Sequence, residues 1–430
     1  MSPKNRKKSS GDDGSYDTPH RCNFCGKPAS KVKRLFAGYE AFICNDCVSL
    51  CHDILTTSVD HSDDTPRLEL PKPTEIKSFL DKYVIGQEEA KKNVAVAVYN
   101  HYKRINAMAE AGAKPGGGSD VELEKSNILL IGPTGTGKTL IARTLARFLK
   151  VSFCIADATV LTEAGYVGED VENILVRLFQ ASDFNQKRTE RGIIYIDELD
   201  KIARTEGNPS ITRDVSGEGV QQGLLKILEG TISNIPPKGG RKHPEQSFVP
   251  IDTTNILFIC GGAFEGLDKI VARRIGKKQV GFDAENLNIS DQSPEILEYV
   301  EPQDLLQYGL IPELIGRLPV TAPLRPLDRN ALFTILTEPQ NAITRQFARL
   351  FELEGIKLKI EDEALWEAVG IAEKKKTGAR ALRSIFEKAM LDIMFDAPSH
   401  DDIKEIIITA GVITGQTKPK IIRKSQKRTA

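Results

Sequence analysis

The sequence predicts an α/β protein built on a parallel sheet with helices on both faces, preceded by a small cysteine-rich module and followed by a smaller, mostly helical domain. Three observations support this prediction. Short apolar runs typical of buried strands alternate with segments whose apolar residues recur at helical spacing. A glycine-rich turn joins one such strand to the next helix. Two Cys-x-x-Cys pairs lie near the N-terminus.

Composition excludes several classes of protein. The chain has 430 residues, 40% hydrophobic and 27% charged, which fits a globular protein of two or three domains. Its formal net charge is zero, so it has no overall attraction to nucleic acid or to an anionic membrane. No apolar run reaches the ~20 residues of a membrane helix, and the basic N-terminus lacks the apolar stretch of a secretory signal. We expect a cytoplasmic protein that binds neither membrane nor nucleic acid.

The N-terminal region contains the cysteine-rich module. Residues 1–19 are polar and expected to be disordered, and the module itself spans residues 20–61. Four thiolates in the pattern C-x2-C-x18-C-x2-C can close a tetrahedral Zn²⁺ shell, which predicts a structural zinc site: Cys22, Cys25, Cys44 and Cys47. The alternative is a pair of redox motifs, but neither lies near a βαβ pattern. Cys51, four residues after Cys47, is expected to pack against neighbours rather than act as a fifth ligand, whereas Cys154 and Cys260 are expected in the core.

A proline-containing linker, residues 62–72, separates this module from a large α/β domain over residues 73–324. Four apolar runs in that domain predict strands: "SNILLIG", "VSFCIAD", "GIIYIDELD" and "NILFICGG". Helices are predicted where apolar residues follow helical spacing, as from Ile141 to Leu149 and from Val171 to Phe179. Residues 325–414 are predicted to form the small, mostly helical domain with a short strand or two, and 415–430 a solvated basic tail.

The segment "GPTGTGKT" matches the phosphate-binding pattern G-x-x-x-x-G-K-[ST] between a strand and a helix. Glycines let backbone N–H groups turn toward phosphate oxygens, where the following helix directs its positive end. Lys138 would reach the β- and γ-phosphates, and Thr139 would ligate Mg²⁺. The predicted nucleotide-binding residues are Gly132, Pro133, Thr134, Gly135, Thr136, Gly137, Lys138 and Thr139.

The run "IIYIDELD" ends in two acids at the carboxyl edge of the predicted sheet. Asp197 should hold the Mg²⁺ shell, and Glu198 should orient the attacking water. The alternative for Glu198 is a solvated acid at a strand end. Asp200 and Lys201 are expected to form a surface ion pair of little energetic weight. The chemistry also needs positive charge, and Arg317 and Arg380 have suitable settings, although residue patterns alone assign neither.

Taken together, these motifs, with "YVIGQ", "AGYVGED", "LIPELIGRLPV" and "GARALRS", resemble AAA+ ATPases of the Clp/Hsp100 class. With the four-cysteine module, residues 20 to about 410 resemble the ClpX unfoldase family. The resemblance implies ATP, Mg²⁺ and Zn²⁺ as cofactors and a homohexameric ring. Such a ring recognises tagged proteins, unfolds them and threads them into a separate serine peptidase, ClpP. The chain itself shows no convincing peptidase constellation.

The resemblance also assigns roles to residues near the nucleotide. Val84 and Ile85 would contact adenine. Arg317 would act as an arginine finger on the ATP of the neighbouring subunit. Arg380 would act from the small domain on the ATP of its own subunit, as a sensor-2 arginine. No polar residue at the end of "NILFICGG" stands out as sensor 1.

Four loops would serve the substrate or the peptidase. Tyr166 and Val167, between glycines, would grip an unfolded chain in the pore, because an aromatic ring contacts any polypeptide without reading its sequence; the alternative is a half-buried turn. Arg213 and Asp214 would belong to a second pore loop. A basic entrance loop would favour acidic tags, unless it is an ordinary solvated turn: Arg241, Lys242 and His243. Peptidase docking would use Val280, Gly281 and Phe282.

That last segment departs from the Ile-Gly-Phe tip of the family. Its valine lacks one methylene of isoleucine, which is worth roughly 0.8 kcal/mol of binding free energy at most.

Two alternative functions are open for the whole chain. One is an AAA+ nucleic-acid motor or clamp loader with a zinc knuckle, which the neutral charge opposes. The other is a chaperone that remodels complexes without a peptidase. The resemblance also implies that the zinc module recruits adaptors and substrates and forms dimers.

Overall fold

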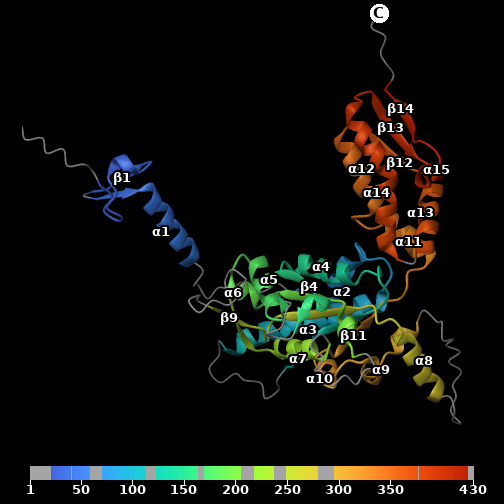
Figure 1. Ribbon diagram of the computed structural model, residues 1–430, viewed down its shortest axis with the longest axis horizontal. Coiled ribbons are helices and arrows are strands. Elements are labelled where there is room, and N and C mark those ends of the chain that lie inside the picture. Colours follow the sequence, from blue (N-terminus) through green and yellow to red (C-terminus); the bar gives the residue numbers. More distant parts are fainter. Residues whose placement is uncertain are drawn as a thin grey trace, which may run out of the picture. The chain divides into compact units, whose positions relative to one another are not determined.

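The computed structural model describes residues 21–39, 41–58, 70–112, 123–162, 169–204, 217–236, 248–278, 295–375 and 377–424. The chain divides into two compact units, Met1–Arg67 and Leu68–Ala430. Figure 1 shows the helices and strands of both units, coloured along the sequence.

The first unit is a short hairpin followed by one helix. Strands β1 (Leu35–Ala37) and β2 (Phe42–Cys44) pair antiparallel, and α1 (Asn45–Ser58) follows directly. Its buried cluster consists of cysteines with a few half-buried apolar neighbours. So little apolar surface cannot offset the entropy of ordering the chain, so the cysteines must contribute most of the stability.

The second unit contains the predicted parallel sheet. Five strands pair in the order β11-β3-β10-β7-β4, and all neighbours are parallel. Their bounds are β3 (Ile128–Ile131), β4 (Phe153–Asp157), β7 (Ile193–Asp197), β10 (Leu257–Gly262) and β11 (Val320–Pro323). The four predicted apolar runs are therefore strands of one sheet, as expected.

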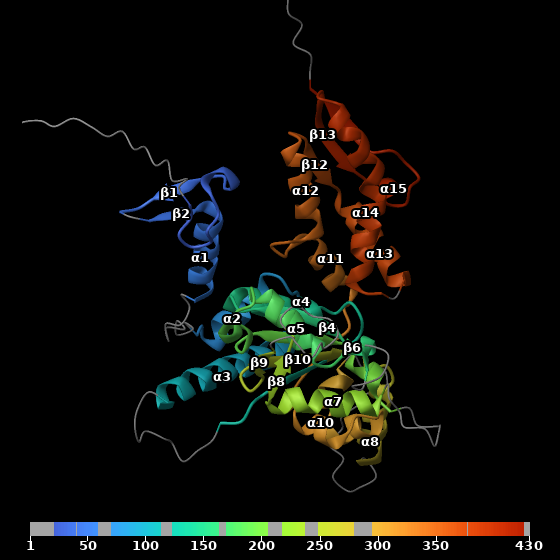
Figure 2. The ribbon, with the colours of Figure 1, turned by 60° about the vertical axis from the view of Figure 1, so that its left-hand side comes forward.

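Alternate residues of these strands enter two different hydrophobic clusters. In β3, Leu129 and Ile131 belong to the cluster that contains residues of α5 and α7, whereas Ile128 and Leu130 pack with α2, α3 and α4. Both faces of the sheet are therefore covered, which explains why its strands read as continuous apolar runs. The helices are α2 (Pro73–Asp81), α3 (Glu88–Gly112), α4 (Lys138–Leu149), α5 (Asn173–Ala181) and α7 (Glu218–Glu229). Figure 2 shows them around the strands.

Shorter elements complete this part of the unit. Two small sheets pair β5 (Leu161–Thr162) with β6 (Glu169–Asp170) and β8 (Ile232–Ile235) with β9 (Val249–Asp252). The remaining helices are α6 (Gln186–Thr189), α8 (Leu267–Lys278), α9 (Pro302–Tyr308) and α10 (Pro312–Gly316). Leu70, which we expected to lie in the linker, instead packs against the α2–α4 side of the core.

The C-terminal part of the unit has its own hydrophobic cluster. Its helices are α11 (Arg329–Thr337), α12 (Ile343–Leu353), α13 (Asp362–Lys375), α14 (Ala379–Asp396) and α15 (Ala410–Ile413). A three-stranded sheet joins them, with β12 (Lys357–Ile360), β13 (Ile403–Ile408) and β14 (Lys420–Arg423). This mostly helical domain confirms the predicted fold class.

The expectation of a solvated tail from residue 415 onward was wrong for β14. Residues Lys420–Arg423 pair antiparallel with β13, on the edge that β12 leaves free. All four β14 side chains are exposed, so the strand forms through backbone hydrogen bonds, which charged residues can make as well as apolar ones. The basic composition of this segment therefore did not predict the strand.

We predict that Phe386→Ala destabilises the C-terminal part by about 3–5 kcal/mol, because the Phe386 ring is fully buried in its core and its removal leaves a cavity. Lys388→Ala on the same helix is the matched control and should change stability by less than about 0.5 kcal/mol, since Lys388 is exposed. Denaturant unfolding followed by circular dichroism measures both. Equal stability of the two variants would contradict this packing.

Candidate functional site

The glycine loop between β3 and α4 is confined by backbone on two sides. A Cβ atom at Gly132 would lie 2.6 Å from the carbonyl oxygen of Leu324, and one at Gly135 would lie 2.7 Å from that of Thr377. Gly135 also has a φ of 83°, which side chains disfavour. Only glycine fits at these positions, so the backbone path of the loop depends on both glycines.

The lysine of the loop is buried, with 8% of its surface exposed. Its Nζ donates to the carbonyl oxygens of Gly132 and Pro133. Burial lowers the pKa of Lys138; the charge of Asp197 opposes this shift and that of Arg380 adds to it. Since α4 begins at Lys138, the ammonium and the positive end of the helix lie together, an arrangement that suits phosphate groups.

Asp197 lies at the end of β7, beside this loop. Its Oδ2 accepts a hydrogen bond of 3.2 Å from Thr139 Oγ1, and its Oδ1 accepts bonds of 3.1 Å from both the backbone N of Glu198 and the phenol of Tyr195. A hydroxyl and a carboxylate side by side are hard oxygen donors of the kind that Mg²⁺ prefers. The structure therefore brings together the two predicted Mg²⁺ residues. Glu198 is exposed and has a φ of 58°.

The expected ion pair with Lys201 is present, but Asp200 is buried rather than at the surface. Its side chain is 1% exposed, and its Oδ1 accepts a hydrogen bond of 3.1 Å from the backbone N of Ala263 after β10. Lys201 Nζ lies 3.6 Å from Oδ2 but is itself half exposed. A Cβ at Gly262 would lie 2.6 Å from Asp200 Oδ1, so the glycine admits the carboxylate. No local pattern of residues indicated this contact.

The predicted adenine residues lie in the connection between α2 and α3. Val84 is 4% exposed, and its Cγ1 would be 3.8 Å from a Cβ at Gly137 of the phosphate loop. Ile85 is half-buried. The guanidinium of Arg147 lies 4.2 Å from the centre of the Tyr83 ring. Of the two predicted adenine residues, Val84 therefore lies beside the glycine loop.

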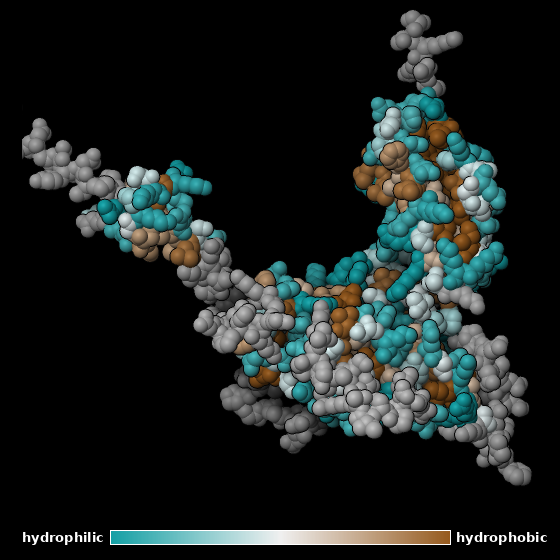
Figure 3. All heavy atoms as spheres, in the orientation of Figure 1, coloured by the Kyte–Doolittle hydropathy of each residue, from teal (hydrophilic) through white to brown (hydrophobic). Residues whose placement is uncertain are grey.

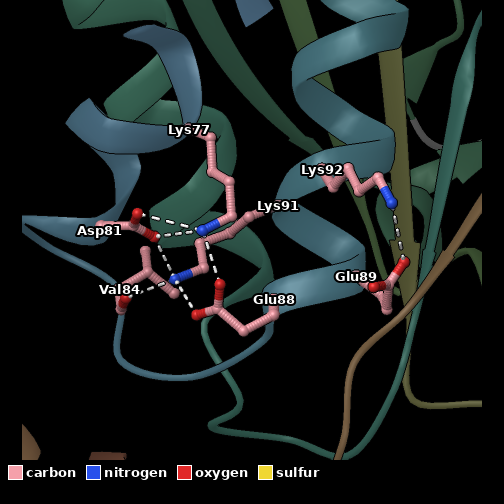
Figure 4. A network of polar contacts seen from close by, with 7 residues as sticks. All are labelled: Lys77, Asp81, Val84, Glu88, Glu89, Lys91 and Lys92. Carbon is pink, nitrogen blue, oxygen red and sulfur yellow. Dashed lines mark hydrogen bonds and ion pairs between the residues drawn. The ribbon is translucent and has the colours of Figure 1, made fainter. Parts of the chain in front are cut away.

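A buried lysine holds this connection in place (Figure 4). Lys91 is 2% exposed, and its Nζ contacts Asp81, the carbonyl oxygen of Val84 at 3.4 Å and Glu88 at 3.0 Å. Lys77 also pairs with Asp81 and Glu88. The network joins the end of α2 to the start of α3, so the intervening segment has both ends fixed. Sequence reasoning missed Lys91, although its i,i+3 spacing from Glu88 is a helix-pairing signal.

Gln87 fixes the same segment to the end of β11. Its Nε2 donates to the carbonyl oxygen of Arg325 and its Oε1 accepts from the Arg325 backbone N, both at 2.8 Å. Gln87 is 8% exposed with a φ of 60°. This reciprocal pair of bonds joins residues 238 positions apart, which no local pattern could reveal.

The two predicted arginines lie in different surroundings. Arg380 is the second residue of α14, and the loop before this helix lies against the phosphate loop, since a Cβ at Gly378 would be 2.9 Å from the Thr134 carbonyl oxygen. Arg317 follows α10 and pairs with Glu229 at 3.0 Å. The structure thus brings Arg380 to the site of its own chain and engages Arg317 in a separate ion pair.

In the first unit, the four predicted cysteine ligands converge, with their sulfur atoms within 4.8 Å of one another. Two separations are 3.9 Å, Cys22 to Cys47, and 3.6 Å, Cys25 to Cys44. Thiolates about 2.3 Å from one tetrahedral zinc stand about 3.8 Å apart, so the arrangement fits the metal. Burial raises the pKa of Cys22, but backbone hydrogen bonds outweigh it and the pKa falls to about 6. Cys51 lies outside this group, and Cys154 and Cys260 are buried as expected.

The remaining predicted site residues lie outside the part of the chain that the structure describes. They are Tyr166, Val167, Arg213, Asp214, Arg241, Lys242, His243, Val280, Gly281 and Phe282. Within the described helices, none has the length and apolar character that spanning a membrane requires.

Comparison with known proteins identifies the class. Residues 123–321 match the family described as AAA domain (Cdc48 subfamily), residues 327–410 the C-terminal, D2-small domain of ClpB protein, and residues 20–57 the ClpX C4-type zinc finger. With the phosphate loop and Asp197 at one sheet edge, these matches define an AAA+ ATPase that uses ATP with Mg²⁺ and carries a zinc finger.

Curated relatives narrow this to a family. Two proteins called ATP-dependent Clp protease ATP-binding subunit ClpX, from Bacteroides fragilis strains ATCC 25285 and YCH46, are each 53% identical over 401 residues. The match covers 92% of this chain and 95% of each relative. The chain belongs to the ClpX family.

We predict that Cys44→Ser abolishes stoichiometric zinc binding and unfolds the first unit, because that unit has little apolar core. Cys51→Ser is the matched control and should keep both zinc and fold. Zinc content by atomic absorption and protease resistance of the N-terminal region measure the effect. Full zinc occupancy in Cys44→Ser would remove Cys44 from the ligand set.

Proposed function

We propose that this chain is an ATP-dependent protein unfoldase that forms a hexameric ring and passes tagged substrates to the ClpP peptidase. The observation that carries the proposal is the shared position of Lys138, Asp197 and the Arg380 loop around one glycine loop, in a chain 53% identical to ClpX relatives. Hydrolysis at this loop can therefore alter contacts between the large and small parts of the unit.

In the proposed mechanism, Lys138 leaves its loop carbonyls to pair with the β- and γ-phosphates, and Thr139 and Asp197 hold Mg²⁺. The bound metal supplies charge neutralisation at the phosphates. Glu198, exposed beside Asp197, orients and polarises the attacking water. Val84 and Ile85 contact adenine. Arg380, near the start of α14, acts on the ATP of its own subunit.

Two features support a ring. Arg317 is bound to Glu229 rather than to the phosphate loop, so we propose that it acts on the nucleotide of a neighbouring copy. An apolar groove of about 470 Å³ also runs between α12 and α14, with Leu350, Leu391 and Phe395 exposed along it. Figure 3 shows apolar side chains at the surface of this C-terminal part. Exposed apolar surface of this kind is typical of protein interfaces.

The substrate and partner roles follow from the family. We propose that Tyr166 and Val167 grip the substrate, that Arg213 and Asp214 line the channel, and that the basic loop receives acidic tags: Arg241, Lys242 and His243. Phe282 with Val280 and Gly281 would dock ClpP. The zinc finger would recruit adaptors and substrates and form dimers. We place the protein in the cytoplasm.

We propose the following division of the chain: a zinc domain over 20–61, a linker over 62–72, a large ATPase domain over 73–324 and a small domain from 325. The pairing of β14 with β13 supports extending the small domain beyond residue 414.

The grip is tested with Tyr166→Ala and Glu198→Gln. We expect Tyr166→Ala to hydrolyse ATP but to fail to unfold a tagged fluorescent reporter, because only the mechanical contact is lost. Glu198→Gln should bind ATP yet lose hydrolysis by at least about a hundredfold, and with it unfolding. Tyr166→Phe keeps the aromatic ring and is the control. Normal unfolding by Tyr166→Ala would exclude a gripping role, and DNA-stimulated ATPase would then favour a nucleic-acid motor.

Peptidase docking is tested at the Val-Gly-Phe segment. Phe282→Ala should abolish ClpP-dependent degradation of the reporter while ATP turnover and unfolding persist. Val280→Ile restores the missing methylene and should tighten ClpP binding by up to about fourfold, the equivalent of ~0.8 kcal/mol. Surface-immobilised ClpP measures both affinities. If Phe282→Ala degrades the reporter normally, the chain does not use this segment for docking.

A further inference from the structure

One buried polar group near the nucleotide site has no role in the mechanism above. Tyr195 lies on β7, two residues before Asp197, so both side chains project from the same face of the strand. The ring is fully buried in the cluster shared with α2, α3 and α4. A buried phenol needs a hydrogen-bond partner, and here the partner is the Asp197 carboxylate, 3.1 Å away.

The neighbouring strand is shaped to admit this phenol. A Cβ atom at Gly261 of β10 would lie 2.3 Å from the Tyr195 hydroxyl oxygen and 3.0 Å from the carbon that carries it. Any side chain there would displace the hydroxyl. Gly261 is therefore needed for the contact between Tyr195 and Asp197, although it lies in a regular strand.

The two carboxylate oxygens of Asp197 accept hydrogen bonds from different donors. Oδ1 accepts from the Tyr195 phenol and from the backbone N of Glu198, whereas Oδ2 faces Thr139 Oγ1 at 3.2 Å. Two donors on one oxygen fix the plane of the carboxylate.

We propose that Tyr195 is a positioning residue for the Mg²⁺ site, which holds Oδ1 of Asp197 so that Oδ2 is presented with Thr139 to the metal. The inference rests on the proposed function, because it assumes that Asp197 and Thr139 serve Mg²⁺. Gly261 is part of the same arrangement, since it provides the space that the phenol occupies.

The test is the Mg²⁺ dependence of nucleotide binding by the full chain. Fluorescent ADP is titrated in Mg²⁺ and in EDTA. The dissociation constant in EDTA divided by that in Mg²⁺ gives the factor by which the metal tightens binding. In Tyr195→Phe we expect this ratio to fall about tenfold, as is usual when an outer partner of a metal ligand is removed. Binding in EDTA should stay unchanged. The Mg²⁺ concentration for half-maximal ATPase should rise by a similar factor.

Tyr102→Phe is the matched control. Tyr102 is also fully buried, and its hydroxyl donates to the backbone carbonyl of Arg191 at 3.1 Å, away from the nucleotide loop. This variant loses one buried hydrogen bond but should keep the wild-type ratio. Equal ratios in Tyr195→Phe and Tyr102→Phe would overturn the positioning role, while wild-type protein that binds no ADP would overturn the proposed function and this inference with it.

Gly261→Ala approaches the same contact from the other strand. The added methyl group should displace the phenol and lower the ratio in the same direction. Combined with Tyr195→Phe, it should add less than it does alone, because the hydroxyl it would displace is already gone. Full additivity of the two substitutions would show that they do not act through one contact. This variant keeps the proposal testable if Tyr195→Phe folds poorly.

Discussion

The nucleotide site depends on the close approach of the glycine loop to backbone on two sides. The Leu324 carbonyl after β11 leaves no room for a Cβ at Gly132, and the Thr377 carbonyl leaves none at Gly135. The loop is therefore held between the end of the central sheet and the loop that precedes α14. Steric confinement of this kind lets a short glycine-rich segment keep one backbone conformation. It also means that any movement of α14 reaches the phosphate loop directly.

Around this loop, buried polar side chains fix the flexible connections. Lys91 joins the two helices on either side of Val84, and Gln87 joins the same segment to Arg325. The Tyr195 phenol occupies the space beside Gly261 and donates to the Asp197 carboxylate. Buried donors and acceptors are costly without partners, so each of these contacts defines one arrangement of the backbone. The site is thus preorganised by side chains that lie outside the glycine loop.

The first unit is stabilised mainly by its metal site rather than by buried apolar surface. Its described residues form a two-stranded hairpin and one helix, with cysteines at the centre in place of a large apolar core. The sulfur geometry matches a tetrahedral metal, and metal binding then takes the place of hydrophobic burial. The two units therefore fold through different forces, one through its zinc site and the other through its layered hydrophobic clusters.

The sequence by itself determined the fold class, the four zinc ligands and the phosphate loop, because each depends on local spacing. Apolar runs at strand length, helical periodicity and Cys-x-x-Cys pairs are all visible within a few dozen residues. The placement of the phosphate loop and Asp197 at one sheet edge followed from parallel topology, since the ends of β3 and β7 meet at the same edge.

Only the tertiary structure decided which polar groups surround that edge. The partners of Lys91, Gln87, Asp200 and Tyr195 come from other strands and loops, and β14 formed because β13 had a free edge. Local sequence can show that a side chain is polar, but not which distant backbone or carboxylate will satisfy it. That pairing is fixed by long-range packing, which is why the sequence predicted the phosphate loop yet missed the residues that hold it.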